Sequence, residues 1–173
     1  MEISVEIIKD LRNQCGAGVM ECRNALLEAK GDMGKALQLL KERGLLKAEK
    51  KASRVTAQGL VEAYVHTGGR IGAMVEVNCE TDFVARTDEF KTLAHDLAMQ
   101  VAALSPQYVS EEGLPEGADV APQAVCLLQQ PFIKDPAKTV RDMIVEVIAR
   151  VGENIRVSRF IRYELGAGDE GNG

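Results

Sequence analysis

Residues 57–79 read AQGLVEAYVHTGGRIGAMVEVNC, the clearest strand signal in the chain. Apolar side chains recur on both sides of Thr67-Gly68-Gly69-Arg70: Leu60, Ala63 and Val65 before it, and Ala73, Val75 and Val77 after it. A glycine pair between two such runs is typical of an antiparallel hairpin, because glycine adopts the backbone angles of a tight turn at no steric cost. We therefore expect two paired strands, Ala57–His66 and Ile71–Cys79.

The sequence after the hairpin predicts two amphipathic helices and a third strand. The first helix follows Thr87 and stops at Ser105-Pro106; its apolar residues recur at helical spacing, at Phe90, Leu93, Ala94, Leu97, Ala98 and Val101. The second begins at Asp135-Pro136, a favourable N-cap followed by a favourable first helical residue, and ends at Gly152. Residues 154–165 alternate as a strand, and the apolar set expected there is Ile155, Val157, Ile161, Tyr163 and Leu165.

Residues 1–45 predict a small module of three short helices separated by glycines. Their apolar stripes are Val5, Ile8 and Leu11; then Val19, Cys22, Leu26 and Ala29; then Met33, Ala36, Leu37 and Leu40. Ser4 and Asp32 are the expected N-caps, and Gly44 is expected to end the third helix. Such a module resembles three-helix bundles of the ubiquitin-associated (UBA) type.

Together these patterns predict an α+β fold: an N-terminal three-helix UBA-like bundle, then a three-stranded antiparallel sheet covered by helices. The expected boundaries are 1–45 for the bundle, 46–55 for a basic linker, 56–165 for the core subdomain and 166–173 for a disordered glycine-rich tail. All five prolines lie between Pro106 and Pro136, so residues 106–136 are expected to be irregular.

Composition excludes several classes of function. The 173 residues include 21 basic and 26 acidic side chains, a net charge of −5, whereas nucleic-acid binding draws on a basic surface. No apolar run reaches the ~20 residues that cross a bilayer, and the acidic N-terminus does not resemble a signal peptide. The four cysteines and two histidines match no zinc spacing, and no nucleophile or acid–base set stands out. We therefore expect a cytoplasmic protein without metal, cofactor or enzymatic activity, and without membrane or direct nucleic-acid partners.

Two further motifs have both a structural and a functional interpretation. The six basic residues from Lys41 to Arg54 can form a solvated connector or a basic docking surface. Gly16-Ala17-Gly18 is half of a dinucleotide-binding fingerprint. It lies between two predicted helices rather than after a strand, which favours a simple helix–helix turn.

The segment between the second strand and the long helix is unusual for a purely structural loop. Residues 78–90 read NCETDFVARTDEF, which places Asp82 and Phe83 just before a helix that Thr87 can cap. In one interpretation Phe83 packs back into the core and Asp82 caps a short turn. In the other, Phe83 is an aromatic anchor displayed on a rigid turn, the kind of residue that dominates a protein–protein contact.

Four phrases of the sequence, taken in order, resemble bacterial translation elongation factor Ts. They are LRNQCGAGVMEC at 11–22, VEVNCETDFV at 75–84, QPFIKDP at 130–136 and VGENI at 151–155. The resemblance runs over nearly the whole chain. It implies a guanine-nucleotide exchange factor for elongation factor Tu, the GTPase that delivers aminoacyl-tRNA.

The resemblance also implies three groups of contact residues. The turn Thr81-Asp82-Phe83-Val84 would enter between helices of the GTPase, near its magnesium and phosphate site. In the N-terminal module, Arg12, Val19 and Met20 would contact the GTPase domain. The segment Tyr64-Val65-His66, with His66 as its contact residue, would make a second contact, to another domain of the same partner.

The chain departs from the family in two ways. The interval between Ser105-Pro106 and Leu127 is short and rich in proline and glycine, where the family has a longer, charged and helical insert. The chain also holds one copy of the sheet subdomain where longer members hold two. We therefore expect a homodimer formed through this subdomain.

Two other functions remain as alternatives. A plain interaction module, using the three-helix bundle, would bind a protein without changing its nucleotide state. An RNA-associated protein, using the basic linker, would bind RNA with a steep dependence on salt, and the net charge of −5 disfavours it.

Overall fold

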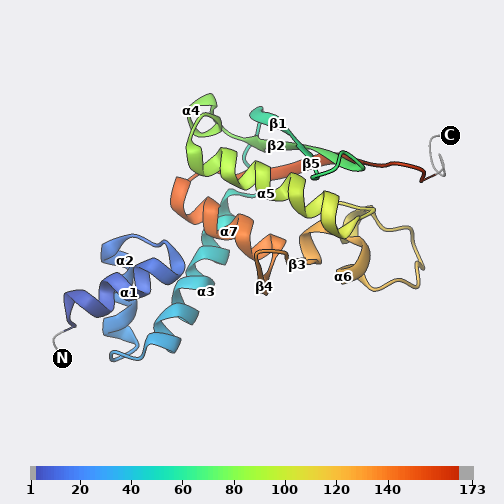
Figure 1. Ribbon diagram of the computed structural model, residues 1–173. Coiled ribbons are helices and arrows are strands. Elements are labelled where there is room, and N and C mark those ends of the chain that lie inside the picture. Colours follow the sequence, from blue (N-terminus) through green and yellow to red (C-terminus); the bar gives the residue numbers. More distant parts are fainter. Residues whose placement is uncertain (1–2, 168–173) are drawn as a thin grey trace. The chain divides into compact units, whose positions relative to one another are not determined.

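The computed structural model describes residues 3–167 and has an α+β fold: N-terminal helices, then a three-stranded antiparallel sheet with helices (Figure 1). The chain forms two compact units. One holds residues 3–54 together with 145–154, and the other holds residues 55–144 together with 155–167. The sequence placed 145–154 in the core subdomain, whereas these residues group with the N-terminal helices.

The first unit contains the three predicted helices, α1 (Val5–Cys15), α2 (Val19–Glu28) and α3 (Met33–Lys51). The predicted caps are confirmed: the Ser4 hydroxyl accepts from the Ile7 amide, and the Asp32 carboxylate accepts from the Lys35 amide at 3.0 Å. The helices bury a shared apolar cluster, made of Ile8, Leu11, Cys22, Ala25, Leu26, Ala29 and Ala36. Val5 and Val19, the first residues of their helices, are exposed rather than part of this core.

The sequence predicts that Gly44 ends the third helix, and this prediction is wrong. Helix α3 continues through Gly44 to Lys51. Gly44 is buried, and a Cβ added there would lie 3.7 Å from Val145 and 3.9 Å from Ala149. Both belong to α7 (Val140–Val151). The small residue therefore lies where a second helix packs against α3, and the predicted linker begins as a continuation of this helix.

The sheet has the predicted hairpin at its start. Strands β1 (Gln58–Val65), β2 (Ile71–Cys79) and β5 (Ile155–Glu164) lie in the order β1-β2-β5, with both pairings antiparallel. The turn places Gly68 and Gly69 at φ +95° and +68°, conformations that favour glycine. At Gly59, φ is +146° and a Cβ would lie 2.1 Å from the Val77 carbonyl oxygen, so β1 and β2 approach too closely there for any side chain.

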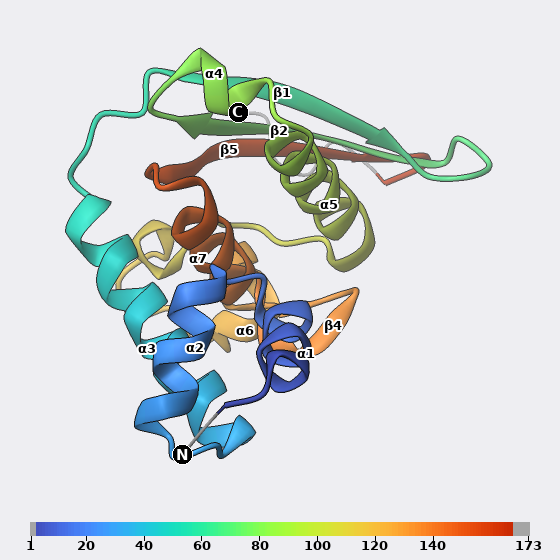
Figure 2. The same cartoon turned by 90° about the vertical axis from the view of Figure 1, so that its left-hand side faces the viewer.

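Helix α5 (Asp88–Leu104) covers one face of the sheet (Figure 2). Thr87 caps it as predicted, its hydroxyl accepting from the Phe90 amide at 3.2 Å, and Ser105 ends it with φ +48°. Its buried apolar residues are those of the predicted stripe, together with Ala102: Phe90, Leu93, Ala94, Leu97, Ala98, Val101 and Ala102. From the sheet, Ala73, Val75, Val77 and Cys79 are buried at alternate positions of β2.

Strand β5 carries a bulge that the alternation of the sequence does not reveal. Val157 pairs with Val77 and Arg159 with Glu76, so Ser158 is an extra residue. Beyond the bulge, the Arg162 side chain donates to the Ala102 carbonyl of α5 at 3.0 Å. The prediction that Ile161, Tyr163 and Leu165 share the face of Ile155 and Val157 is therefore wrong, and all three are exposed.

The helix predicted to begin at Pro136, with Asp135 as its N-cap, starts four residues later. Residues Asp135–Thr139 form β4, which pairs with β3 (Pro131–Phe132), and α7 begins at Val140. The reason is a capping box at Thr139: its hydroxyl accepts from the Asp142 amide at 3.1 Å, while the Asp142 carboxylate accepts from the Thr139 amide at 2.9 Å. This reciprocal pair satisfies more backbone groups than Asp135 alone could.

The remaining segments are short. They are α4 (Asp82–Ala85), η1 (Glu111–Gly113), α6 (Pro122–Val125) and η2 (Leu127–Gln129), the last three within the stretch expected to be irregular. At the C-terminal end, the Ala167 amide donates to the Glu164 carbonyl in a turn. The rest of the predicted disordered tail, residues 168–173, lies outside the described residues.

Candidate functional site

The turn after β2 displays an aromatic side chain. Phe83 lies in α4 with 78% of its surface exposed, whereas the next residue, Val84, is only 6% exposed. The interpretation in which Phe83 packs into the core is therefore wrong. An exposed phenylalanine on a folded turn is the arrangement expected of a binding anchor.

Hydrogen bonds from threonines hold this turn at both ends. The Thr81 hydroxyl accepts from the Val84 amide at 3.3 Å, and the Thr87 hydroxyl donates to the Val84 carbonyl at 2.7 Å. The Cys79 thiol lies 3.1 Å from the Thr81 carbonyl. With Val84 and Ala85 buried beneath it, the backbone that carries Phe83 is fixed before any partner arrives.

One interpretation of the sequence supposes that Asp82 caps the turn. It does not, because Thr81 occupies the N-cap position. The Asp82 carboxylate instead forms an ion pair with Arg86, one turn along, at 2.8 Å. Both side chains are largely exposed, and exposed pairs of this kind contribute little to stability. The Asp82 carboxylate is therefore accessible to a partner, at the cost of one weak ion pair.

In the N-terminal unit, the three residues singled out by the sequence are all exposed. Arg12 lies on α1, and Val19 and Met20 begin α2. Gly16-Ala17-Gly18 joins the two helices, and Gly16, at φ +67°, ends α1 with its amide donating to the Arg12 carbonyl. This confirms the interpretation of the three residues as a helix–helix turn.

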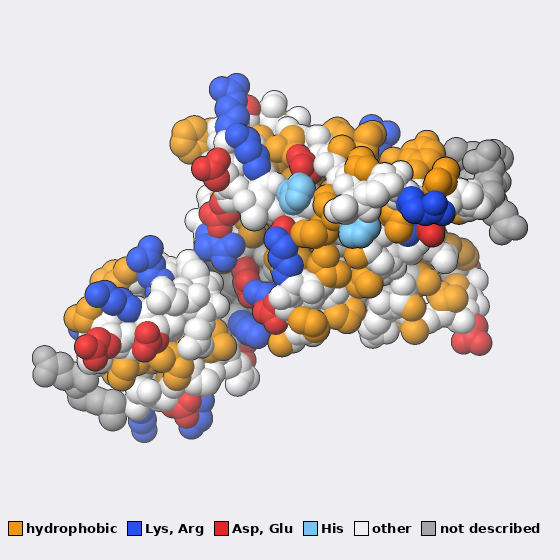
Figure 3. All heavy atoms as spheres, in the orientation of Figure 1, with side chains coloured by type: hydrophobic (Ala, Val, Ile, Leu, Met, Phe, Trp, Pro, Cys, Tyr) orange, Lys and Arg blue, Asp and Glu red, His pale blue; other side chains and the backbone are white. Residues whose placement is uncertain are grey.

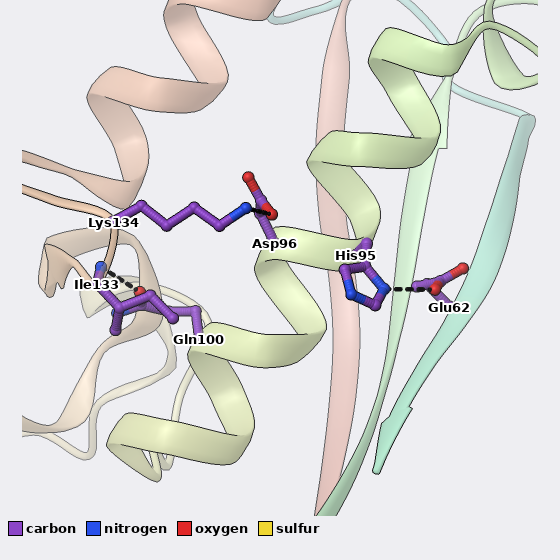
Figure 4. Close-up of polar contacts among 6 residues, drawn as sticks. All are labelled: Glu62, His95, Asp96, Gln100, Ile133 and Lys134. Carbon is purple, nitrogen blue, oxygen red and sulfur yellow. Dashed lines mark hydrogen bonds and ion pairs between the residues drawn. The ribbon is translucent and has the colours of Figure 1, made fainter. Parts of the chain in front are cut away.

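His66 begins the tight turn after β1 and is exposed. It belongs to a cluster that the sequence analysis did not identify, made of Glu62, Tyr64, His66 and His95. Figure 4 shows the imidazole of His95, on α5, pointing toward the Glu62 carboxylate, on β1. The available signal was the spacing of Glu62, Tyr64 and His66 at alternate positions, which places them along one side of a strand.

A second polar cluster, also drawn in Figure 4, fastens the β3–β4 hairpin to α5. The fully buried Gln100 side chain accepts from the Ile133 amide at 2.9 Å and donates to the Pro131 carbonyl at 3.0 Å. Nearby, Lys134 pairs with the nearly buried Asp96. These partners satisfy polar groups that would otherwise be costly to bury, so the cluster has a structural role.

The face of the sheet opposite α5 exposes apolar side chains, which the sequence analysis did not identify as a surface. We call it the open sheet face; its apolar residues, each between 41% and 69% exposed, are Val61, Val65, Met74, Ile161, Tyr163 and Leu165. The strand register sets Met74 opposite Ile161 and Gly72 opposite Tyr163. Farther along, Arg159 forms an ion pair with Glu76 at 2.7 Å and lowers the pKa of this carboxyl group, with help from Asn78.

Within residues 3–167, no group of three or more His, Cys, Asp and Glu side chains is arranged to hold a metal ion. In the same range, no helix is long and apolar enough to span a bilayer. The four cysteines are free thiols, and Cys15 and Cys22 lie 4.0 Å apart.

Comparison with known proteins gives one consistent family. Residues 35–121 match the family described as elongation factor TS. The chain is 48% identical to elongation factor Ts of Carboxydothermus hydrogenoformans, over 96% of this chain and 90% of that protein. It is 50% identical to the factor of Heliobacterium modesticaldum, over 96% of this chain and 91% of that protein. It is 48% identical to the factor of Thermotoga petrophila, over 98% of this chain and 100% of that protein.

The same alignments show a difference in length. The alignment with the Carboxydothermus protein extends over 196 residues, more than the 173 of this chain. The relative therefore has residues within the aligned region that this chain lacks. A shorter chain is what the short interval after Ser105-Pro106 leads one to expect.

Proposed function

The chain belongs to the elongation factor Ts family, and we propose that it promotes the release of GDP from elongation factor Tu during translation elongation. One observation supports the proposal above all others: Phe83 is 78% exposed on a turn whose backbone is fixed by hydrogen bonds. The chain acts as a binding partner in the cytoplasm and not as an enzyme, so none of its residues is assigned a catalytic role.

In this proposal the turn acts as a wedge. A GTPase holds its nucleotide through a phosphate loop and a magnesium ion that bridges the phosphates. The Phe83 ring, which is large, apolar and stiff, enters between helices of the GTPase near that site. The Asp82 carboxylate competes for hydrogen-bond donors that otherwise support the metal site. Because the turn is already ordered, little conformational entropy is lost on insertion.

Two further contacts hold the partner while the wedge acts. Arg12, Val19 and Met20 of the N-terminal unit bind the GTPase domain, and His66 binds a second domain. Exposed apolar and arginine side chains are well suited to this role. The contacts matter because exchange is reciprocal: the factor by which this chain loosens the nucleotide equals the factor by which the nucleotide loosens this chain. Each tenfold of that factor needs about 1.4 kcal/mol of coupling, so one ring is not expected to supply all of it.

We also propose that the chain forms a homodimer through the open sheet face. The face offers apolar side chains from all three strands, and in the described part of the chain only this one sheet subdomain is present. Two copies related by a twofold axis would bury the same patch on each other. The Glu76–Arg159 ion pair then lies toward the edge of the contact, where polar groups are usual.

Stopped-flow release of a fluorescent GDP analogue from elongation factor Tu tests the exchange function. Wild-type chain is expected to accelerate release, and Phe83→Ala to lose most of the acceleration. Val55→Ala is the matched control, because Val55 is an exposed apolar residue distant in sequence from the turn. Binding without acceleration by the wild type would instead support the plain interaction module, and acceleration unaffected by Phe83→Ala would move the mechanism to the other contacts.

A further inference from the structure

Four side chains form a continuous cluster between the hairpin and α5. Glu62, Tyr64 and His66 follow one another at alternate positions along β1 and into its turn, and His95 lies opposite them on α5. Both histidines of the chain therefore belong to this cluster, and Figure 3 shows them on the same face of the molecule. The cluster extends from the helix to the exposed turn.

The exposed end of the cluster is a hydrogen bond between Tyr64 and His66. The phenolic oxygen of Tyr64 lies 3.0 Å from Nδ1 of His66. This contact occupies one of the two ring nitrogens, Nδ1, so Nε2 is the ring nitrogen left for a partner. An exposed histidine next to two turn glycines would otherwise sample several side-chain rotamers, and ordering it on binding would cost entropy.

Tyr64 is itself held in place from the helix. The rings of Tyr64 and His95 meet edge to face, with centroids 5.7 Å apart and planes at 81°. The Nδ1 atom of His95 lies 3.0 Å from the Glu62 carboxylate, two residues before Tyr64 on the same strand. His95 therefore contacts both Tyr64 and its neighbour Glu62, which fixes the direction of the tyrosine ring.

We propose that Tyr64 and His95 are positioning residues for His66. Tyr64 donates its hydroxyl proton to Nδ1, since a phenol is a better donor than acceptor. The proton of the neutral imidazole then lies on Nε2, so His66 presents a hydrogen-bond donor at a fixed place on the turn. The partner group that fits it is an acceptor, a carbonyl or carboxylate oxygen. The inference rests on the proposed function in one respect, that His66 contacts the GTPase.

The orientation of His66 can be tested without any partner. Three-bond coupling constants about χ1 of His66 are measured by NMR in the wild type and in Tyr64→Phe, which keeps the ring and removes the hydroxyl. The wild type is expected to show one dominant rotamer and Tyr64→Phe an average over several. Tyr108→Phe, a hydroxyl deletion elsewhere in the same unit, should leave the couplings unchanged. A single unchanged rotamer in Tyr64→Phe would overturn the inference.

His95 is tested in the same way with His95→Ala, and thermal unfolding of each variant checks that the chain still folds. Release of Tyr64 from His95 is expected to broaden the rotamer distribution of His66, although less than removal of the hydroxyl does. His66 couplings identical to the wild type in His95→Ala would remove His95 from the proposal.

A double-mutant cycle then tests the functional role. Affinity for elongation factor Tu is measured for Tyr64→Phe, for His66→Ala and for the double variant. We expect Tyr64→Phe to weaken binding several-fold in the wild-type background and to have no effect once His66 is alanine. An equal effect in both backgrounds would show that Tyr64 does not act through His66. If His66→Ala alone leaves affinity unchanged, the proposed contact of His66 is wrong, and the NMR result still decides whether Tyr64 orients it.

Discussion

Phe83 and Val84 are consecutive residues on one helical turn, yet their surroundings are opposite: 78% of Phe83 is exposed and 6% of Val84. This contrast separates binding from stability. Phe83→Ala is expected to change the free energy of unfolding by less than about 0.5 kcal/mol, as for other surface positions. If Phe83 is a binding anchor worth about 2 kcal/mol, the same change slows nucleotide release about 30-fold at subsaturating concentration.

Val84→Ala should behave in the reverse way. It removes two buried methyl groups and is expected to cost about 2 kcal/mol of stability. Because the Val84 side chain lies beneath the turn and only Phe83 is displayed to a partner, exchange by the folded fraction is expected to fall less than in Phe83→Ala. Urea denaturation followed by circular dichroism, together with stopped-flow release, measures both quantities. The assignment of Phe83 to binding and Val84 to stability would be contradicted if Phe83→Ala were the less stable variant.

The open sheet face leads to a prediction about oligomeric state. Met74 lies on the central strand of the sheet, with Ile161 opposite it. Met74→Lys places a charge in the proposed contact and is expected to raise the dimer Kd at least about tenfold, because burying an unpaired charge is costly. Light scattering at micromolar concentration should show a dimer for the wild type and a monomer for Met74→Lys. Val120→Lys, at another exposed apolar position, should remain dimeric. A monomeric wild type would refute the proposed dimer.

The Glu21–Lys47 ion pair predicts how the N-terminal unit responds to acid. The contact with Lys47, more than any other group, lowers the pKa of Glu21 from its ordinary value of 4.5. A lowered pKa in the folded state means that the contribution of Glu21 is present above pH 4.5 and is lost as the pH falls through the lowered value. Because both side chains are about two-fifths exposed, the contribution is expected to stay below about 1 kcal/mol.

Denaturation of the wild type, Glu21→Gln, Lys47→Met and the double variant measures this contribution. At about pH 7 each single variant should be slightly less stable than the wild type, and the double variant no worse than either. As the pH is lowered below 4.5, the difference between Glu21→Gln and the wild type should shrink. A difference that grows as the pH is lowered would mean that the sign of the linkage is wrong.

The thiol of Cys22 is expected to react slowly with alkylating reagents. Burial, followed by the neighbouring Cys15 thiol, raises its pKa from 9.0 to about 11. Since the thiolate is the reactive form, alkylation of Cys22 by iodoacetamide at about pH 8 is expected to be at least tenfold slower in the folded than in the unfolded chain. Peptide mass spectrometry after timed quenching measures this rate for each cysteine. Equal rates for Cys22 in the native chain and in urea would refute the prediction.

Local patterns predicted most of the fold because they are set by neighbouring residues. The glycine pair of the hairpin, the Thr87 cap and the stripe of α5 each depend on residues within a few turns of one another, and all are confirmed. The errors at Gly44 and Asp135 have different causes. At Gly44 a helix distant in sequence, α7, packs against α3, and no local pattern reveals it. Near Asp135 the deciding signal is itself local, because the Thr139–Asp142 capping box competes with Asp135-Pro136 as a helix start.

The candidate site was only partly predictable for a related reason. The sequence identified Phe83 as an unusual residue, but its exposure depends on which neighbours fill the core beneath the turn. The His95–Tyr64 contact joins residues 31 positions apart, on a helix and a strand. The open sheet face was hidden by a single extra residue, because Ser158 reverses the alternation that assigns Ile161 and Tyr163 to a face.

The close approach of β1 to β2 at Gly59 has a consequence for any library of random variants selected for exchange activity. Every substitution there would be depleted, because even a methyl group would lie 2.1 Å from the Val77 carbonyl oxygen. The depletion would look the same as that of a partner-contacting residue such as Phe83. Only a parallel selection for abundance would separate them: position 59 should fail both selections, and position 83 should fail the first alone.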